Sequence, residues 1–137
     1  MTFLVDTSVW SLVFRRDAPG EAPEAAALRE ALVGGLTVLT TGLALQELLQ
    51  GFSGPRARER IVECLEALPF ITPDRGDHVA AAEIRNTCRR GGVQVGTIDT
   101  LLIQLSRRHG ADLLTTDLHF AAAARHVRFP SWQARPA

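Results

Sequence analysis

Short apolar runs alternate with helical patterns along the whole chain, and this alternation limits the fold more than any other feature. Apolar runs predict strands at residues 3–5, 36–39, 70–71, 113–114 and 127–129. Apolar residues three and four apart predict helices around residues 9–13, 23–33, 42–50, 55–68, 80–90, 97–109 and 120–124. Strands separated by helices favour a parallel sheet covered on both faces, so the expected class is α/β.

The chain is long enough for one compact domain. It has 137 residues, and 46% of them are hydrophobic, which is enough to fill a core without disulfides. We expect one domain over residues 1–130, a loop at 17–20 and a loose C-terminal tail at 131–137. Cys64 and Cys88 each lie alone in an apolar helical pattern, so both are expected to be reduced core residues.

Composition restricts the classes of partner. No apolar run is long enough for a membrane span, and the N-terminus lacks the pattern of a signal peptide, so we expect a soluble, cytoplasmic protein. The formal net charge is zero and every basic residue is arginine. A polyanion would therefore have to be held by local arginine clusters, although each can equally be a solvated helix end. These clusters are Arg15 with Arg16, Arg56 with Arg58 and Arg60, Arg89 with Arg90, and Arg107 with Arg108.

Four carboxylates stand where strands end or helices begin, or inside an apolar helix. Asp6 and Asp117 each follow a predicted strand, and Asp99 lies in the first turn of a predicted helix. In parallel sheets ligands gather at the carboxyl ends of the strands, so these acids would share an edge if their strands are neighbours. Glu47 lies within an otherwise apolar helix, where a buried carboxylate would need a partner.

A divalent cation is the partner that such a cluster requires. Carboxylates close together repel one another, and Mg²⁺ prefers oxygen ligands while keeping several waters. One or two Mg²⁺ or Mn²⁺ ions can generate hydroxide from bound water and stabilise the charge of a phosphodiester undergoing hydrolysis. The hypothesis from the residues is therefore a metal-dependent phosphodiester hydrolase.

Each acid also has an ordinary explanation. Asp6, Asp99 and Asp117 can simply cap helix N-termini, and Glu47 can lie on the solvent side of its helix. Ser8 and Thr116 flank the acids and can assist them or cap turns. Elsewhere, Asp74 and Asp77 are predicted to cap one helix, Thr40 and Thr41 the helix at 42–50, and Thr97 the helix at 97–109. The four histidines, which lack metal-ligand spacing, are left out of the site. The combination of four acids is harder to explain by capping than any single one.

Four motifs occur in order over residues 2–129: Leu4-Val5-Asp6-Thr7-Ser8-Val9-Trp10, Gln46-Glu47-Leu48-Leu49-Gln50-Gly51, Thr97-Ile98-Asp99-Thr100-Leu101-Leu102-Ile103 and Leu113-Leu114-Thr115-Thr116-Asp117-Leu118-His119-Phe120. This pattern resembles the PIN-domain ribonucleases, and specifically the VapC toxins of prokaryotic type II toxin-antitoxin systems. The resemblance implies a single PIN-like domain with a parallel sheet of about five strands in the order 3-2-1-4-5. It implies an acidic metal site made of Asp6, Glu47, Asp99 and Asp117, assisted by Thr116 and Ser8.

The same resemblance implies an activity and partners. The expected activity is a Mg²⁺-dependent endoribonuclease, with Mn²⁺ as a substitute, that hydrolyses structured RNA such as transfer RNA. The expected partners are the RNA substrate, a second copy of the chain in a homodimer, and a cognate VapB-type antitoxin. Exposed apolar surface for a partner is a possibility around Trp10, Leu12 and Phe14, which can equally be core residues.

Three other functions compete with this one. A receiver-type signalling module needs a lysine, and the chain has none. A haloacid-dehalogenase-like phosphatase needs Asp-x-Asp after the first strand, but position 8 is serine. A catalytically silent PIN-like domain acting as a binding or scaffold module remains as the alternative, although the presence of all four acids argues against it.

Overall fold

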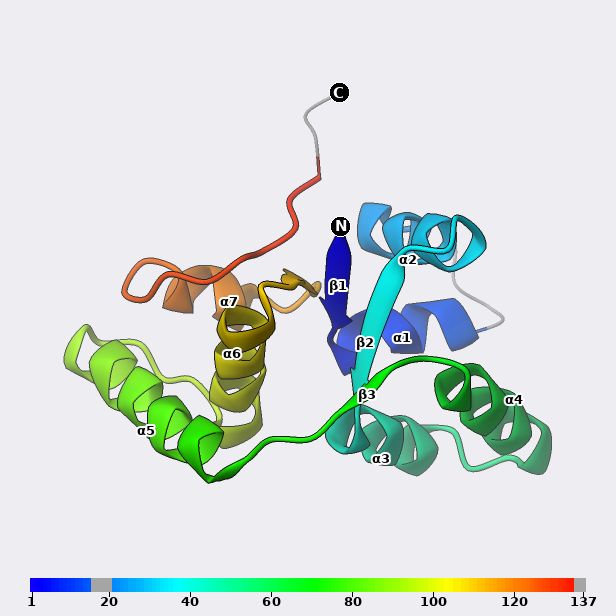
Figure 1. The fold of residues 1–137 in the computed structure, drawn as a ribbon, viewed down its shortest axis with the longest axis horizontal. Helices are drawn as coiled ribbons and strands as arrows, with labels where there is room; N and C mark the ends of the chain where they lie inside the picture. Colours follow the sequence, from blue (N-terminus) through cyan, green and yellow to red (C-terminus); the bar gives the residue numbers. More distant parts are fainter. Residues whose placement is uncertain (16–20, 135–137) are drawn as a thin grey trace.

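The computed structural model describes residues 1–15 and 21–134, so the expected loop 17–20 and the last three residues of the expected tail lie outside the described residues. Strands and helices alternate along the chain (Figure 1). The elements are β1 (Thr2–Val5), α1 (Thr7–Phe14), α2 (Pro23–Val33), β2 (Thr37–Thr41), α3 (Gly42–Gly51), α4 (Pro55–Glu66), β3 (Phe70–Ile71), α5 (Arg75–Arg90), α6 (Thr97–His109), β4 (Asp112–Leu114) and α7 (Leu118–Ala123). No helix in the described ranges is long and apolar enough to cross a membrane.

The strands form one parallel sheet in the order β3-β2-β1-β4. The expected parallel α/β architecture is therefore confirmed. β1 and β4 are neighbours, and the Asp6 N–H donates to the carbonyl of Leu114 at 2.9 Å, directly beyond their last paired residues. The strand ends that carry Asp6 and Asp117 therefore lie side by side, an adjacency that the resemblance implied.

The predicted fifth strand at residues 127–129 is wrong, and the described part of the sheet has four strands instead of about five. A single parallel bridge joins Leu113 to Ser131 on the outer edge of β4, with hydrogen bonds from Leu113 to Pro130 and from Trp132 to Leu113. Pro130 has no N–H to donate, which keeps this segment from extending into a ladder. The chain does return to the outer edge of β4, as the order 3-2-1-4-5 implied, but it makes a single bridge at Ser131 instead of a strand at 127–129.

Alternate strand residues face two different cores. Leu4, Leu39 and Leu113 pack with α5, α6 and α7, while Phe3, Val5, Val38 and Leu114 pack with α1 to α4. This period of two is what a sheet buried on both faces requires. Figure 1 shows α5, α6 and α7 on one side of the sheet and α1 to α4 on the other. The cysteines are free, with Cys88 buried and Cys64 partly buried, and burial raises the pKa of both thiols.

Helix ends follow local chemistry, with one correction. Thr41 caps α3 as predicted, because its hydroxyl accepts the Ala44 N–H at 3.1 Å. Thr97 was expected to cap α6, but the cap residue is Gly96 and no side chain caps this end. Gly110 ends α6 in the left-handed region, at φ 60°, where glycine carries no steric cost.

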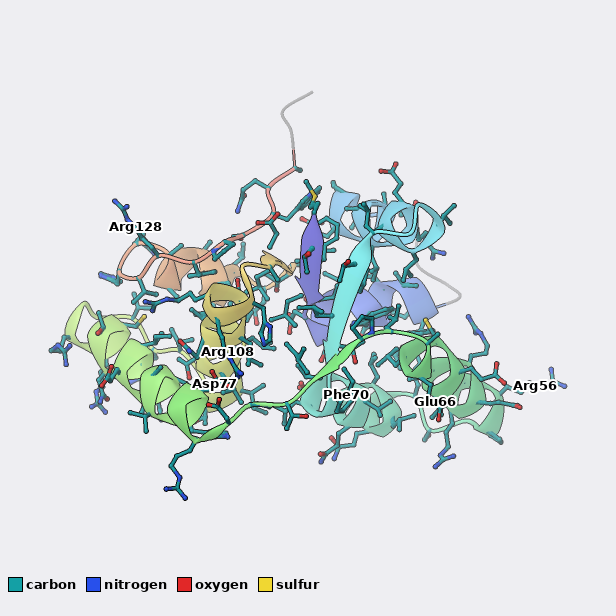
Figure 2. The ribbon with its side chains drawn as sticks, viewed as in Figure 1. Arg56, Glu66, Phe70, Asp77, Arg108 and Arg128 are labelled. Atoms are coloured by element: carbon teal, nitrogen blue, oxygen red, sulfur yellow. The ribbon has the colours of Figure 1, made fainter. Side chains whose placement is uncertain are left out.

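An ion pair between the buried Asp77 and the exposed Arg108 ties α5 to α6. Asp74 and Asp77 form the predicted capping box at the start of α5. Asp77 is only 2% exposed, and its carboxylate also accepts hydrogen bonds from Arg108 at 2.6 Å and Gln104 at 3.2 Å. Burial alone would raise the pKa of Asp77, but these hydrogen bonds and the charge of Arg108 outweigh it and lower the pKa. Figure 2 shows Asp77 and Arg108 beside each other between the two helices.

Replacing Arg108 by alanine should therefore lower the free energy of unfolding by about 2 kcal/mol, because it leaves the buried Asp77 charge without its strongest donor. Asp77 has a lowered pKa in the folded state, so its contribution is present above the ordinary pKa of aspartate and is lost as the pH falls. Urea denaturation at neutral and acidic pH measures both effects. Arg107→Ala is the control, and an equal loss in both variants would contradict the role of the ion pair.

Candidate functional site

The carboxyl ends of β1 and β4 open into a cavity of about 580 Å³. All four acids singled out from the sequence line it, although they come from four separate segments of the chain. The lining residues are Asp6, Thr7, Ser8, Ser11, Glu47, Gly96, Thr97, Ile98, Asp99 and Asp117. We call this cavity the acidic cavity.

Asp6 is the most buried of the four acids. It is 8% exposed and stands at the N-cap of α1, but its side chain makes no capping hydrogen bond. Instead its Oδ2 accepts hydrogen bonds from the hydroxyls of Ser8 at 2.7 Å and Thr115 at 2.8 Å. The capping explanation of Asp6 is therefore wrong, and the carboxylate is held in place by two hydroxyl donors.

The two predicted auxiliary residues have different positions. The Ser8 hydroxyl contacts Asp6 and also accepts the backbone N–H of Thr116 at 3.1 Å. The exposed Thr116 meets Ser8 through its backbone, while the neighbouring Thr115 supplies the hydroxyl at Asp6. Thr115 also accepts the backbone N–H of Asp117 at 3.0 Å, which links the turn after β4 to Asp6.

Glu47 reaches the cavity from the side of solvent. The expectation of a buried carboxylate is wrong, because Glu47 is exposed on α3. The solvent-side alternative is correct for its burial, but the residue still lines the acidic cavity and accepts a hydrogen bond from the Thr7 hydroxyl at 3.1 Å. Glu47 is therefore the acid that can move most freely toward a ligand.

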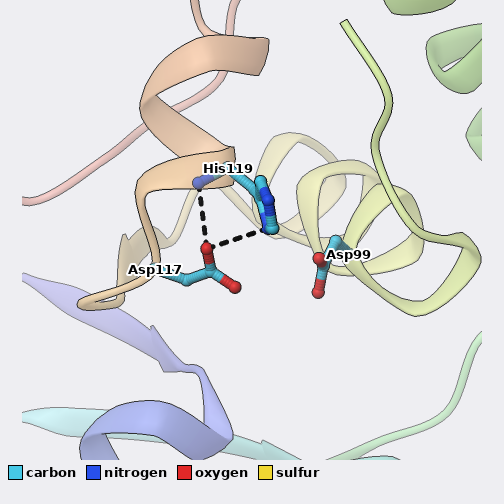
Figure 3. Close-up of side chains that lie close together, drawn as sticks. All are labelled: Asp99, Asp117 and His119. Atoms are coloured by element: carbon cyan, nitrogen blue, oxygen red, sulfur yellow. Dashed lines mark hydrogen bonds and ion pairs between the residues drawn. The ribbon is translucent and has the colours of Figure 1, made fainter.

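Asp99, Asp117 and His119 form the tightest group of potential ligand atoms (Figure 3). One carboxylate oxygen of each aspartate and one ring nitrogen of His119 lie within 4.8 Å of one another. Asp117 caps α7 by accepting the His119 N–H at 2.9 Å, and its Oδ1 also lies 3.1 Å from Nδ1 of the His119 ring. The capping explanation of Asp117 is thus correct, but it leaves the second carboxylate oxygen outside the cap.

Asp99 carries the electrostatic cost of this arrangement. Partial burial and the nearby charges of Asp6, Asp117 and Glu47 raise its pKa to about 6, although His119 lowers it in part. A carboxylic acid with a raised pKa beside other carboxylates is the expected state of a site that a cation would neutralise.

The donor set fits a hard divalent cation. Asp6, Asp99 and Asp117 are anchored or half-buried oxygen donors, which are the ligands that Mg²⁺ and Mn²⁺ prefer. Partial burial and the neighbouring charges of Asp6 and Asp117, which raise the pKa of Asp99, are consistent with negative charge that a cation would compensate. His119 adds a nitrogen ligand that suits Mn²⁺ better than Mg²⁺.

Two residues of this site were missed from the sequence. His119 was left out with the other histidines. It stands two positions after Asp117 in the first turn of a helix, so its ring lies near the Asp117 and Asp99 carboxylates. Thr116 was chosen instead of Thr115. Successive side chains of an extended segment point to opposite sides, so only one of the two threonines can face Asp6, and it is Thr115.

The fold and the cavity define a class: a parallel α/β domain with an acidic cavity at the carboxyl ends of its strands. Residues 3–126 match the PIN domain family model, and the chain therefore belongs to the PIN domain family.

Similar proteins lie among the VapC ribonucleases. Ribonuclease VapC11 of Mycobacterium tuberculosis is 30% identical over 124 residues, which cover 89% of this chain and 91% of that protein. Two solved structures share the fold. VapBC2 from Rickettsia felis, bound to a promoter DNA fragment, has a TM-score of 0.71 at 18% identity and covers 96% of this chain and 98% of its own. Mycobacterium tuberculosis VapC20, a sarcin-ricin loop cleaving toxin, has a TM-score of 0.66 at 21% identity and covers 88% and 94%.

Replacing Asp99 by asparagine should stabilise the metal-free protein. The raised folded-state pKa means that Asp99 contributes most to stability below its ordinary value near 3.8, and that this contribution is lost as the pH rises through about 6. At neutral pH the free energy of unfolding of Asp99→Asn should therefore exceed that of the wild type by about 1 kcal/mol, after allowing for solvent screening at this half-buried site.

Thermal denaturation in EDTA measures the difference, which should narrow as the pH is lowered from about 7 toward 4. Added Mn²⁺ should raise the midpoint of the wild type more than that of the variant. A destabilised Asp99→Asn protein at neutral pH would show that the carboxylates do not repel one another as described.

Proposed function

We propose that this protein is a metal-dependent endoribonuclease of the VapC type, which cuts structured RNA such as transfer RNA. The observation that carries the proposal is the acidic cavity, where four carboxylates from separate segments meet in a PIN-family domain. The similarity to VapC ribonucleases over 89% of the chain supports the choice of RNA as substrate. We place this activity in the cytoplasm.

The residues have distinct tasks in this mechanism. Asp6, Asp99 and Asp117 would hold one or two Mg²⁺ ions, with Mn²⁺ as a substitute, and Glu47 would complete the ligand set. When bound, the cation supplies an activated water and stabilises the charge on the phosphodiester. Ser8 and Thr115 fix the Asp6 carboxylate through its Oδ2, so this carboxylate needs to move little when a cation binds.

The remaining side chains orient the other two acids. Thr7 donates to Glu47 from the first turn of α1, and His119 holds Asp117 at the start of α7. Asp99 must lose its proton before it can act as a ligand, so cation affinity should fall as the pH drops below about 6. The chain offers these groups as ligands and positioning residues, and water is the nucleophile.

Cleavage of total cellular RNA tests the activity directly. In Mg²⁺ or Mn²⁺ the wild type should give discrete cuts that sequencing can map, and EDTA should abolish them. Asp6→Asn removes one anchored carboxylate and should reduce cleavage by about a hundredfold or more.

The matched control is Asp74→Asn, which changes the same charge at the start of α5, away from the acidic cavity. Cuts that survive EDTA, or that are equal in Asp6→Asn, would point to a contaminating nuclease. A protein that binds Mn²⁺ but cuts no RNA would contradict the proposal, and one that neither binds Mn²⁺ nor cuts would favour the silent scaffold module.

A VapB-type antitoxin is the proposed protein partner. Solved structures with this fold include VapBC from Salmonella typhimurium bound to DNA, in addition to the Rickettsia felis complex. In this assignment the antitoxin would suppress cleavage, and adding it in purified form to the RNA assay checks the suppression.

A homodimer is the proposed assembly, through an apolar face beside the acidic cavity. Trp10 and Phe14 are core residues, with exposed fractions of 0% and 9%, and Leu12 is only partly exposed, so these three residues do not form an exposed apolar face. Phe70 on β3 and Ile98 on α6 instead line an apolar cavity of about 710 Å³, and Phe70 is 56% exposed (Figure 2). Because this cavity shares Thr97 and Ile98 with the acidic cavity, a second copy seated here would bring two acidic sites together.

Replacing Phe70 by aspartate should convert the dimer to a monomer, because it places a charge in the centre of the apolar face. Light scattering after size-exclusion chromatography measures the mass. Val33→Asp is the control, since Val33 is 91% exposed at the end of α2 and does not line this cavity. A dimer that survives Phe70→Asp would place the interface elsewhere.

A further inference from the structure

A third pocket, of about 650 Å³ and lined by both apolar and arginine side chains, lies between the end of α1 and the start of α4. It is distinct from the acidic cavity and shares no lining residue with it. Its lining residues are Phe14, Arg15, Phe52, Gly54, Pro55, Arg56, Ala57 and Arg60. We call it the arginine–phenylalanine pocket.

Aromatic rings form the apolar part of this pocket. Phe14 at the end of α1 is 9% exposed, and Phe52 meets it edge to face with ring centroids 6.5 Å apart. The guanidinium of Arg60 lies over the Phe14 ring, 5.9 Å from its centroid. This cation–π contact restrains Arg60 while leaving its N–H donors available to a ligand.

The charge of the pocket is positive. Arg56 and Arg60 supply this charge, and none of the lining residues within the described ranges carries a carboxylate. Arg56 and Arg60 are four apart on α4 and therefore lie on the same face of this helix. The chain as a whole has no net charge, so this concentration of arginine is local. A phosphate group is the ligand that two forked guanidinium groups recognise best.

Helices α1 and α3 both extend from the region of the acidic cavity toward this pocket. α1 begins directly after Asp6 and ends at Phe14, and its eight residues span about 12 Å. α3 carries Glu47 and ends at Gly51, immediately before Phe52. Figure 1 shows α1 and α3 both running from the edge of the sheet toward the side where α4 lies. The acidic cavity and the arginine–phenylalanine pocket therefore lie toward opposite ends of α1.

We propose that the arginine–phenylalanine pocket binds a nucleotide of the RNA strand that flanks the cleaved bond. Arg56 and Arg60 contact its phosphate, and the exposed part of the phenylalanine pair supports its base. Positive charge next to aromatic rings is the combination that single-stranded RNA requires, because phosphates and bases alternate along it. The inference rests on the proposed ribonuclease function and adds a positioning site to it.

RNA binding without cleavage tests the pocket separately from catalysis. In EDTA, the fluorescence anisotropy of a labelled single-stranded RNA is measured over a series of salt concentrations. Arg56→Gln combined with Arg60→Gln should weaken binding about tenfold and reduce the slope of log affinity against log salt by about 1.4, since two phosphate contacts are lost.

The matched control is Arg89→Gln combined with Arg90→Gln. It removes the same charge at the end of α5, on the opposite side of the molecule, where Arg89 and Arg90 donate hydrogen bonds to Asn86 and Thr87 of their own helix. A second variant, Arg56→Lys with Arg60→Lys, keeps the charge and should retain the salt slope. In multiple-turnover cleavage the glutamine variant should raise KM about tenfold with kcat little changed, which a merely structural role would not produce.

The outcomes separate this inference from the proposed function. Wild-type binding and cleavage that are unchanged by the glutamine variant would overturn the pocket and leave the ribonuclease intact. An equal loss in the α5 control would also overturn it, because general charge would then explain the binding. The glutamine variant could instead keep RNA binding but no longer bind an acidic peptide that the wild type binds. The pocket would then be a protein-docking site, and the inference would be wrong.

Discussion

Repulsion among carboxylates at one edge of the sheet is the constraint around which this molecule is organised. Four acids from distant segments line the same cavity, and partial burial together with the charges of the other three raises the pKa of Asp99. The protein supports this arrangement with hydroxyl donors from Ser8 and Thr115, which fix the most buried acid. Such an arrangement costs stability unless a cation compensates it, and proteins retain costs of this kind at functional sites.

The rest of the fold holds the four segments in register. Adjacent parallel strands β1 and β4 bring Asp6 and Asp117 together, and both faces of the sheet are sealed by apolar cores. Asp99 depends on α6, which is anchored to α5 through the buried Asp77 and its partner Arg108. Asp6 and Asp117 stand in short connections, between β1 and α1 and between β4 and α7, so regular elements on both sides fix the positions of these carboxylates.

Opposite charges are separated within a chain that has no net charge. The acidic cavity lies at the start of α1, and the arginine–phenylalanine pocket lies at its other end. The proposed nuclease would use both signs, because negative groups would hold the cation and positive groups would attract the RNA phosphates. The two sites lie toward opposite ends of α1, whose eight residues span about 12 Å.

Periodicity and local chemistry let the sequence by itself determine the α/β class, the parallel sheet, the helix faces and the four acids, because these depend on neighbours along the chain. The tertiary structure alone decided which groups meet: that Thr115 and not Thr116 contacts Asp6, that His119 joins Asp99 and Asp117, and that Glu47 is exposed. It also decided that residues 127–129 form no strand. The segment lies beside β4, where Pro130 has no N–H to donate to a longer ladder of hydrogen bonds. Contacts between distant segments depend on how the elements pack, and spacing along one sequence carries no record of that packing.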